Sequence, residues 1–278
     1  MNNGLMAGGD VVGQPPSSGT ARAFAAAGEP IPLGGGQQTA WRVGSTVFKR
    51  ADTAPEVLTW LEQLLTSLDG RSDFRVAPPL RSTSGSLIVD GWTAWRYEPG
   101  QFVARRWAEI IEVSRDFHPA VAAVPRPRFL DRRDDNWAVA DRVAWGEVTA
   151  ENYAGVNHVA ALSAALRPIE AAQQLIHGDL TGNVLFSDGL PPLVIDLSPY
   201  WRPPTMAAAI VVADALVFEG ADRKLVDRMM FALPDFDQFL LRALIYRTVT
   251  DWLANRDRAT TADPYRAAVD LTLSLADR

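Results

Sequence analysis

The stretch LIHGDLTGNVLF, residues 175–186, places one of the three histidines of the chain two residues before an acid. Asn183 follows that acid, Asp179, by four positions, and apolar residues bracket the whole stretch. Further along, LVIDLS at residues 193–198 places a second acid, Asp196, after another short apolar run. The runs VLF and PLVID flank a Ser-Asp-Gly turn, a pattern that predicts a β-hairpin. The sequence therefore predicts two acids and an amide around one hairpin.

The length and charge of the chain limit its class. At 278 residues it has room for two modest domains or for one large fold of two lobes. Its net charge of −6 supplies no basic excess for phosphate backbones, so we predict neither nucleic acid nor a membrane as a partner. Cysteine is absent, which excludes disulfides and thiolate–metal sites. A reducing, cytoplasmic location is therefore predicted.

The N-terminal segment has the composition of a tail. Residues 1–20 are rich in Gly, Asn, Pro and Ser, and they lack the basic segment and apolar run of a signal peptide. We expect this segment to be mobile. The apolar run at 206–218 is too short to cross a bilayer and contains an acid, so it predicts a core helix.

Residues 21–98 have the pattern of a small, mainly antiparallel sheet with one helix. TAWRVGSTVFKR at 39–50 and SLIVDGWTAWRYEPG at 86–100 are rich in β-branched and aromatic residues around Gly-Ser and Asp-Gly dipeptides. Such runs predict two hairpins. Between them, apolar residues at helical spacing predict a helix over about 53–68.

A capping box is expected at the start of this helix. Thr53 and Glu56 have the required spacing, and Pro55 lies inside the first turn, where proline is favoured.

The rest of the chain, 99–278, is mainly helical in pattern. The mixed charges of 125–142 predict a surface loop whose charges are solvated. The pattern as a whole predicts an α+β fold of two lobes, a small antiparallel β-sheet lobe with one helix and a larger, mainly helical lobe. The expected helices span roughly 102–118, 157–174, 205–219, 223–232, 236–255 and 264–277.

The choice of basic residues is uneven. Of 27 basic residues only Lys49 and Lys224 are lysines. The use of lysine rather than arginine at position 49, the end of the first hairpin, therefore calls for an explanation. A β-rich region with a glycine turn and a lone lysine, followed by HGDLTGNVLF and LVIDLS, resembles the aminoglycoside phosphotransferase branch of the protein-kinase-like fold. The resemblance covers about residues 30–278. Leu-Ser follows Asp196 where protein kinases have Phe-Gly, which is similar to the kinases of small molecules.

The resemblance implies an ATP- and Mg²⁺-dependent phosphotransferase. Such an enzyme moves the γ-phosphate to a hydroxyl of a small molecule, here an aminoglycoside, a sugar or an amino alcohol. Residues 21–98 would form the nucleotide-binding lobe, and residues 99–278 would carry the catalytic loop and the acceptor site. The sequence does not name the acceptor or the oligomeric state.

The loop residues fit the chemistry that the resemblance implies. Phosphoryl transfer needs positioning and charge neutralisation rather than covalent work by the protein. Asp179 suits the carboxylate that orients the acceptor hydroxyl and takes its proton. Asn183 and Asp196 offer the oxygen ligands that Mg²⁺ prefers. His177 is expected to orient the loop through hydrogen bonds.

The resemblance also assigns nucleotide contacts to the first lobe. Lys49 is expected at the α- and β-phosphates, where a compact ammonium fits. Its carboxylate partner is expected to be Glu56, with Glu62 as the alternative. The glycine turn is expected to cover the phosphates, and the hinge to meet adenine through backbone groups. These residues are Gly34, Gly35, Gly36, Tyr97 and Glu98.

Three residues after the hairpin are candidates for supporting roles. Asp214 lies inside the apolar helix, where an unpaired carboxylate would be costly, and the resemblance assigns it hydrogen bonds from the catalytic-loop backbone. Trp201 and Arg202 follow Asp196 closely and are candidates for the acceptor site. Core packing and a surface ion pair are the alternatives for these two.

The catalytic loop departs from the family pattern by one residue. Three residues separate Asp179 from Asn183, where four are usual. Gly182 would let the backbone tighten so that the amide reaches the metal. If it does not, the alternative is a catalytically weak, kinase-like nucleotide-binding sensor or scaffold.

A hydrolytic metal site is a third interpretation. It would use His177, Asp179 and Asp196 as ligands, but three histidines and no cysteine leave few options for zinc. The presence of Lys49 and Asn183 beside the two acids favours the kinase over both alternatives.

Overall fold

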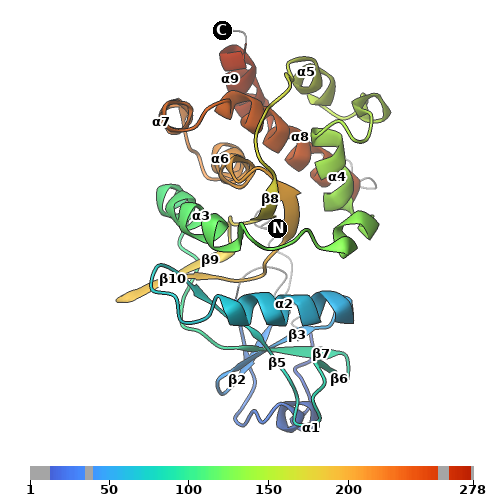
Figure 1. Ribbon diagram of the computed structural model, residues 1–278, viewed down its shortest axis with the longest axis vertical. Coiled ribbons are helices and arrows are strands. Elements are labelled where there is room, and N and C mark those ends of the chain that lie inside the picture. The colour runs from blue at the N-terminus through green and yellow to red at the C-terminus, as the bar shows by residue number, and fades with distance from the viewer. Residues whose placement is uncertain (1–12, 35–39, 256–262, 277–278) are drawn as a thin grey trace. The chain divides into compact units, whose positions relative to one another are not determined.

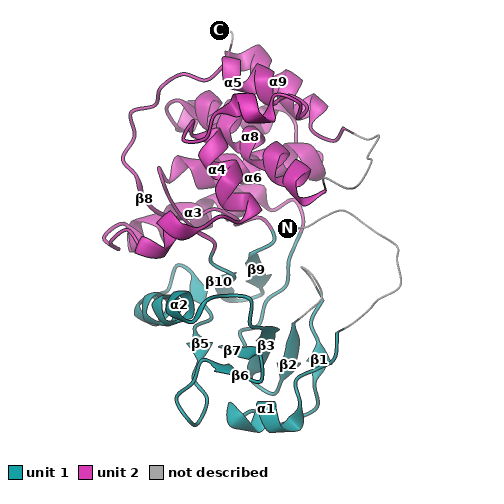
Figure 2. Ribbon diagram, turned by 90° about the vertical axis from the view of Figure 1, so that its right-hand side faces the viewer, with its two compact units in different colours: residues 1–103, 182–197 teal, residues 104–181, 198–278 magenta. Residues whose placement is uncertain are grey.

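The computed structural model divides into two compact units. It describes residues 13–34, 40–255 and 263–276. Unit 1 consists of the described part of Met1–Val103 with Gly182–Leu197, and unit 2 consists of Ala104–Thr181 with the described part of Ser198–Arg278. Figure 1 labels the elements, and Figure 2 colours unit 1 teal and unit 2 magenta.

An antiparallel sheet forms the centre of unit 1. Five of its six strands follow the order β1-β2-β3-β7-β5, and β6 pairs with β7. Both predicted hairpins are confirmed as β2–β3 and β6–β7. Lys49 lies opposite Thr93 in the register of β3 with β7, inside the sheet rather than at its edge. The strands are β1 (Ile31–Pro32), β2 (Trp41–Val43), β3 (Thr46–Arg50), β5 (Pro79–Leu80), β6 (Ile88–Val89) and β7 (Trp92–Arg96).

Turn chemistry and a small core hold this sheet. The β6–β7 turn has φ of 51° at Asp90 and 74° at Gly91, the two positive values that a type I′ turn requires. Phe48 and Ala94 are fully buried on one face. Phe24, the C-cap residue of α1 (Ser18–Ala23), packs edge-on against Phe48 with ring centroids 5.7 Å apart. Helix α1 thus covers part of the sheet.

The start of α1 overlaps the tail expected at residues 1–20. Ser17 is the N-cap, and its side chain accepts the backbone N–H of Thr20 at 3.0 Å. A serine cap satisfies one of the free N–H groups of the first turn, so the Pro-Ser-Ser composition of this segment belongs to a helix start.

Helix α2 (Pro55–Ser67) is present as predicted, but the capping box is wrong. Ala54 is the N-cap, without a side-chain cap, and the Thr53 hydroxyl donates to Asp52. A residue before proline is pushed out of the helical region, so the helix begins at Pro55. Glu56 therefore occupies the second helical position rather than the third that a capping box needs.

The predicted hairpin after the catalytic loop is confirmed, and it lies in unit 1. Strands β9 (Val184–Ser187) and β10 (Leu190–Val194) pair antiparallel, and β4 (Arg75–Val76) adds to β10 in parallel. Gln101 forms an isolated bridge with Phe186. This hairpin was expected to belong with residues 99–278, whereas these contacts group it with the first unit.

Unit 2 is built around two helices and a two-stranded sheet. Helix α8 contacts α4, α5, α6 and α9, and β8 (Gln174–His177) pairs antiparallel with β11 (Pro199–Arg202). Figure 1 shows α6 and α8 side by side. The helices are α3 (Trp107–Val121), α4 (Asn136–Ala144), α5 (Val159–Ala164), α6 (Thr205–Phe218), α7 (Arg223–Ala232), α8 (Phe236–Ala254) and α9 (Arg266–Ala276), with 3₁₀ turns η1 (Arg128–Arg132) and η2 (Ala150–Tyr153). Among the described residues, no helix combines the length and apolarity needed to cross a membrane.

Two helix predictions in unit 2 are wrong. The helix expected over 157–174 ends at Ala164, because Pro168 follows closely and disfavours helix before it. The loop expected over 125–142 contains the start of α4, which Asp135 caps by accepting the N–H of Ala138 at 3.0 Å. Asp141 on this helix is buried, so the charges of the segment are not all solvated.

Candidate active site

Lys49 and Asp196 form an ion pair within unit 1, between Nζ of the lysine and Oδ1 of the acid. The lysine Nζ also lies 5.8 Å from the ring centroid of Trp95. Asp196 has φ of 49°, a left-handed conformation that is uncommon for residues other than glycine. The side chain of Asp196 is 47% exposed to solvent. Two predicted nucleotide-site residues are thus together, with an accessible carboxylate.

Asn183 and Asp196 flank the open end of the β9–β10 hairpin. The N–H of Ile195 donates to the carbonyl oxygen of Asn183 at 3.0 Å, next to the pair Val184–Val194. An amide and a carboxylate therefore end the two strands. Both side chains offer oxygen atoms, the ligands that a hard cation such as Mg²⁺ prefers. Phosphate oxygens and water would complete the coordination shell of the ion. The donor set fits Mg²⁺.

The expected partner of Lys49 lies elsewhere. Glu56 is exposed in the first turn of α2, where the start at Pro55 places it. Glu62 accepts two hydrogen bonds from the Arg81 guanidinium, at 2.7 and 2.5 Å. Asp196, rather than either glutamate, is the carboxylate that Lys49 contacts.

The glycine turn is only partly described. Gly34 is described, and Gly35 and Gly36 lie outside the described residues. A Cβ added at Gly34 would meet no described atom within 4 Å, so no close approach explains this glycine.

The hinge residues use their side chains within unit 1. The guanidinium of Arg42 lies 3.7 Å from the ring centroid of Tyr97, a cation–π contact. Glu98 forms ion pairs with Arg75 at 3.2 Å and with Arg96 at 2.8 Å. Nη2 of Arg75 also donates to the carbonyl oxygen of Pro99 at 2.8 Å, so these contacts fix the segment through side chains and one carbonyl group.

His177 ties the catalytic loop to α3 within unit 2. Its Nδ1 accepts the backbone N–H of Asp179 at 3.1 Å, and its own backbone N–H donates to Nε2 of His118 at 3.1 Å. Nδ1 of His118 lies 2.8 Å from the carbonyl oxygen of Ser114. A carbonyl only accepts, so the proton of His118 lies on Nδ1 and leaves Nε2 as an acceptor. These are the contacts of a loop-orienting histidine.

His118 must be neutral to play this part. Burial lowers the pKa of His118 to about 4, against the opposing effect of its bond to the Ser114 backbone. The imidazole is therefore uncharged at neutral pH. The hydrogen bond from the His177 backbone N–H to Nε2 of His118 on α3 is therefore kept at neutral pH.

Gly178 allows a close approach inside unit 2. A Cβ at this position would lie 2.4 Å from Cδ2 of Tyr200 on β11. The phenol ring is buried, and its hydroxyl hydrogen-bonds to that of Tyr246 at 3.1 Å. Glycine is required at 178 because a tyrosine ring occupies the space that a side chain would need.

Arg247 on α8 joins two acids of unit 2. Its Nη2 donates to Oδ1 of Asp179 at 2.8 Å and to Oδ2 of Asp214 at 2.6 Å, while Nε donates to Oδ1 of Asp214 at 2.7 Å. Asp214 had been expected to accept backbone N–H groups of the loop. The structure places the arginine there instead, because α6 and α8 pack together and a buried acid needs a counter-charge.

The same arginine controls the charge of Asp179. Burial would raise the pKa of this carboxyl, but the Arg247 guanidinium outweighs it and holds the pKa below its usual range. The pKa of Asp214 is raised by complete burial, against the pull of Arg247. Asp179 is thus an anion whose side chain is still 20% exposed, as a proton acceptor needs.

The short loop between Asp179 and Asn183 contains a glycine in a left-handed conformation. Gly182 has φ of 81°, and no atom lies within 4 Å of a Cβ built there. The requirement is therefore for a left-handed backbone rather than for space. Units 1 and 2 divide between Thr181 and Gly182, so this glycine also marks the passage from one unit to the other.

The interpretation as a hydrolytic metal site gains no support. The described residues contain no group of three or more His, Asp and Glu side chains that could hold a metal ion. Nδ1 of His177 is already occupied by the N–H of Asp179.

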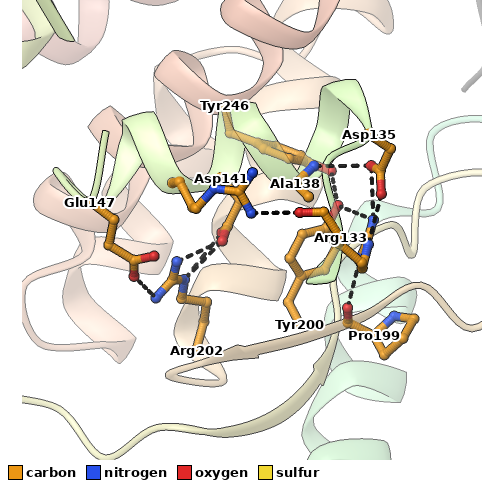
Figure 3. Close-up of polar contacts among 10 residues, drawn as sticks. Arg133, Asp135, Ala138, Asp141, Glu147, Pro199, Tyr200, Arg202 and Tyr246 are labelled. Carbon is orange, nitrogen blue, oxygen red and sulfur yellow. Dashed lines mark hydrogen bonds and ion pairs between the residues drawn. The ribbon is translucent and has the colours of Figure 1, made fainter. Parts of the chain in front are cut away.

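Arg202, a candidate for the acceptor site, is buried in ion pairs. It donates to Asp141 through Nε and Nη2, the latter at 2.6 Å, and to Glu147 through Nη1 at 2.6 Å (Figure 3). Its neighbour Trp201 is half-buried and lines a cavity in unit 2. The ion pairs make Arg202 a structural residue of β11.

Sequence reasoning missed His118, Tyr200 and Arg247. Arg247 had a visible signal, because it interrupts the apolar run ALIYRTVT of a helix that is buried on nearly every face. His118 follows Ser114 by one helical turn, but nothing in the sequence couples either to His177.

Comparisons with known proteins establish the family and the fold. A model of the phosphotransferase enzyme family matches residues 28–209, whereas a search of curated proteins found no significant match. The crystal structure of an aminoglycoside phosphotransferase from Alicyclobacillus acidocaldarius subsp. acidocaldarius is 15% identical, with a TM-score of 0.58 over 95% of this chain and 93% of that one. Choline kinase LicA from Streptococcus pneumoniae is 12% identical, with a TM-score of 0.60 over 91% and 96% of the two chains.

A third solved structure, of a spectinomycin phosphotransferase with ADP and spectinomycin, is 15% identical, with a TM-score of 0.53 over 90% and 92% of the chains. At these identities the likeness establishes the fold, and the predicted two-lobed, protein-kinase-like class is confirmed. The family match spans well over half of the sequence and contains the loop, the hairpin and Lys49. The chain therefore belongs to the phosphotransferase enzyme family, the aminoglycoside phosphotransferase-like group of protein-kinase-like proteins.

Proposed function

We propose that this protein transfers the γ-phosphoryl group of ATP to a hydroxyl of a small molecule in a Mg²⁺-dependent reaction. The observation that carries the proposal is the state of Asp179. This carboxylate follows the orienting His177, is held by Arg247 at 2.8 Å, and keeps one-fifth of its side-chain surface exposed. An oriented, ionised and accessible carboxylate is what a general base for a hydroxyl requires.

The nucleotide side of the reaction belongs to unit 1. Asn183 and Asp196 would hold Mg²⁺, and Lys49, now paired with Asp196, would turn to the phosphates. The ion, when bound, neutralises charge that develops on the transferring group. The solved spectinomycin phosphotransferase contains ADP, which supports a nucleotide as phosphoryl donor.

The proton side belongs to unit 2. The hydroxyl oxygen of the acceptor attacks the γ-phosphorus, the bond from phosphorus to the bridging oxygen of ADP breaks, and the hydroxyl proton passes to Asp179. Arg247 keeps the carboxylate turned and ionised before the transfer. Asp214 accepts hydrogen bonds from Nε and Nη2 of the same guanidinium and so holds the arginine in place.

A panel of acceptors tests the proposal. Aminoglycosides, spectinomycin, sugars, choline and ethanolamine would each be incubated with ATP and Mg²⁺, and ADP release and the ³¹P spectrum of the product measured. We expect one class to give acceptor-dependent ADP release and a phosphomonoester. The Asp179→Asn variant is the matched control, because it keeps the size of the side chain and removes the base.

The short loop between Asp179 and Asn183 favours a second candidate, a nucleotide-binding sensor with weak catalysis. The same assay separates the two. Mg²⁺-dependent ATP binding without turnover on any acceptor would support the sensor. The absence of cysteine supports a cytoplasmic location for either protein.

A further inference from the structure

Unit 2 contains a cavity of about 250 Å³ that the proposed reaction does not use. Its volume is close to the lower end for small-molecule pockets. Side chains from η1, α4 and β11 line it, including Leu130, Arg142, Tyr200 and Trp201. Apolar surface from Leu130 and two aromatic residues is therefore combined with charge.

Most of the charged groups around this cavity are already paired. Arg202 forms ion pairs with both Asp141 and Glu147. Arg126 forms an ion pair with Asp131 at 2.7 Å. A cation entering the cavity would therefore meet only carboxylates that already have a guanidinium partner.

Arg133 is also paired with a carboxylate, as Figure 3 shows. Its Nε and Nη2 donate to Asp135 at 2.9 and 3.1 Å, and Nη1 donates to the carbonyl oxygen of Pro199 at 2.9 Å. Nη2 also reaches the Tyr200 hydroxyl at 3.4 Å. The guanidinium thus holds β11 and is neutralised by Asp135, with four of its five N–H groups used in these bonds.

Arg142 differs from the other lining arginines. Its Nη1 donates to the carbonyl oxygen of Arg133 at 2.8 Å, and no carboxylate pairs with it among the residues that the structure describes. Nε and Nη2 are therefore left as donors on a half-buried cation at the cavity wall. Arginine recognises carboxylate and phosphate groups with this planar set of N–H groups.

We propose that this cavity is a binding site for the phosphate or carboxylate group of a small molecule, with Arg142 as the residue that holds the anion. The Trp201 and Leu130 side chains would contact the uncharged part of the ligand. Tyr200 forms one wall of the cavity and also packs against Gly178 of the catalytic loop. The site thus adjoins the loop through one aromatic ring and does not require the proposed reaction.

Calorimetric titration of the full chain with inorganic phosphate and with glucose 6-phosphate tests this site. We expect binding that weakens with added salt and at least tenfold weaker binding in Arg142→Gln. Gln173→Glu is a second variant that keeps the fold, because this lining residue is exposed and the change is isosteric. It adds a negative charge to the cavity and should also weaken binding. Tighter binding of the ester indicates a larger anionic molecule as the ligand, and equal binding indicates a free anion.

Two controls fix the location. Arg228→Gln makes the same charge change on the exposed surface of α7 and should leave the affinity unchanged. Lys49→Gln reports on anions held at the nucleotide site. The proposal is overturned if no heat of binding is seen, if Arg142→Gln and Gln173→Glu bind as well as the natural sequence, or if Lys49→Gln alone abolishes binding.

Discussion

Nη2 of Arg247 donates a hydrogen bond to Oδ1 of Asp179 at 2.8 Å. The same guanidinium also donates to both carboxylate oxygens of Asp214. One cation from α8 therefore serves two acids, one in α6 and one in the catalytic loop. The arrangement carries a net charge of −1, with the negative charge accessible only at Asp179, because Asp214 is 5% exposed. The counter-ion of the proposed base comes from a helix far along the chain.

Replacing Arg247 should shift the pH dependence of turnover. In Arg247→Met, two close and desolvated carboxyls lose their cation, so the pKa of Asp179 should rise from its depressed value. Burial raises the pKa of the nearby Tyr246 hydroxyl, so this group supplies no positive charge in place of the arginine. The acidic limb of kcat/KM should then move to higher pH.

Arg247→Lys is the matched variant, since it keeps one positive charge and loses the second arm of the fork. We expect a smaller shift of the acidic limb. Stability should fall by about 3–5 kcal/mol in Arg247→Met, because a buried acid is left unpaired. Unchanged pH profiles in both variants would show that Arg247 has only a structural role.

The acids of the two units should separate binding from turnover. Asp179→Asn should leave nucleotide affinity nearly unchanged and lower kcat by about 10²–10⁴, the usual contribution of a positioned base. Asp196→Asn should weaken binding of Mg²⁺-nucleotide as well, because it removes a ligand charge. Calorimetry and turnover on both variants are the measurement. Equal loss of nucleotide binding in the two would contradict the assignment.

Lys49→Arg should not be conservative. A planar guanidinium directs its donors differently from an ammonium and is larger, so nucleotide affinity should fall roughly tenfold, within the value of one charge-assisted hydrogen bond. Lys224→Arg, at the exposed start of α7, is the control. Normal ATP affinity in Lys49→Arg would make this lysine an ordinary strand residue.

ATP should stabilise the fold only in the presence of Mg²⁺. Nucleotide at 100 times its dissociation constant adds about 2.7 kcal/mol, visible as a higher Tm. The shift should disappear with EDTA and shrink in Asp196→Asn. Identical melting curves with and without the metal would count against Asn183 and Asp196 as its ligands.

Gly178→Ala should destabilise unit 2. The new Cβ would lie 2.4 Å from the buried Tyr200 ring, and overpacking of this kind costs about 1–3 kcal/mol. Gly155→Ala is the control, because a Cβ there meets no described atom within 4 Å. Chemical denaturation of both variants measures the difference. Equal stability would mean that Tyr200 can move aside.

Local patterns predicted much of the fold. The hairpins β2–β3 and β6–β7 were predicted from turn dipeptides, and the helices from α6 onward from apolar spacing. Both kinds of pattern depend on neighbouring residues alone. The missed helix α4 begins at Asn136, after its N-cap Asp135, within a run of charges, and its apolar face is short. Burial of Asp141 against Arg202 joins residues 61 positions apart, which no local pattern reports.

The residues of the candidate site were also predictable only where they are close in sequence. The residues of the loop and hairpin are close in sequence, so their motif was readable. The contact of Lys49 with Asp196 spans 147 positions and that of Arg247 with Asp179 spans 68, and both depend on how elements pack. Glu56 is exposed in the first turn of α2, and the carboxylate that Lys49 contacts in this structure is Asp196.

The family match ends at residue 209, and α8 lies beyond it. A polypeptide cut there would keep every motif residue, yet Asp179 would lose the cation that holds it. The proposed base therefore depends on two parts of the chain that are remote in sequence, the loop and α8. Substitutions in α8 that look like ordinary changes of a buried helix should be read as active-site changes when they alter Arg247 or its placement.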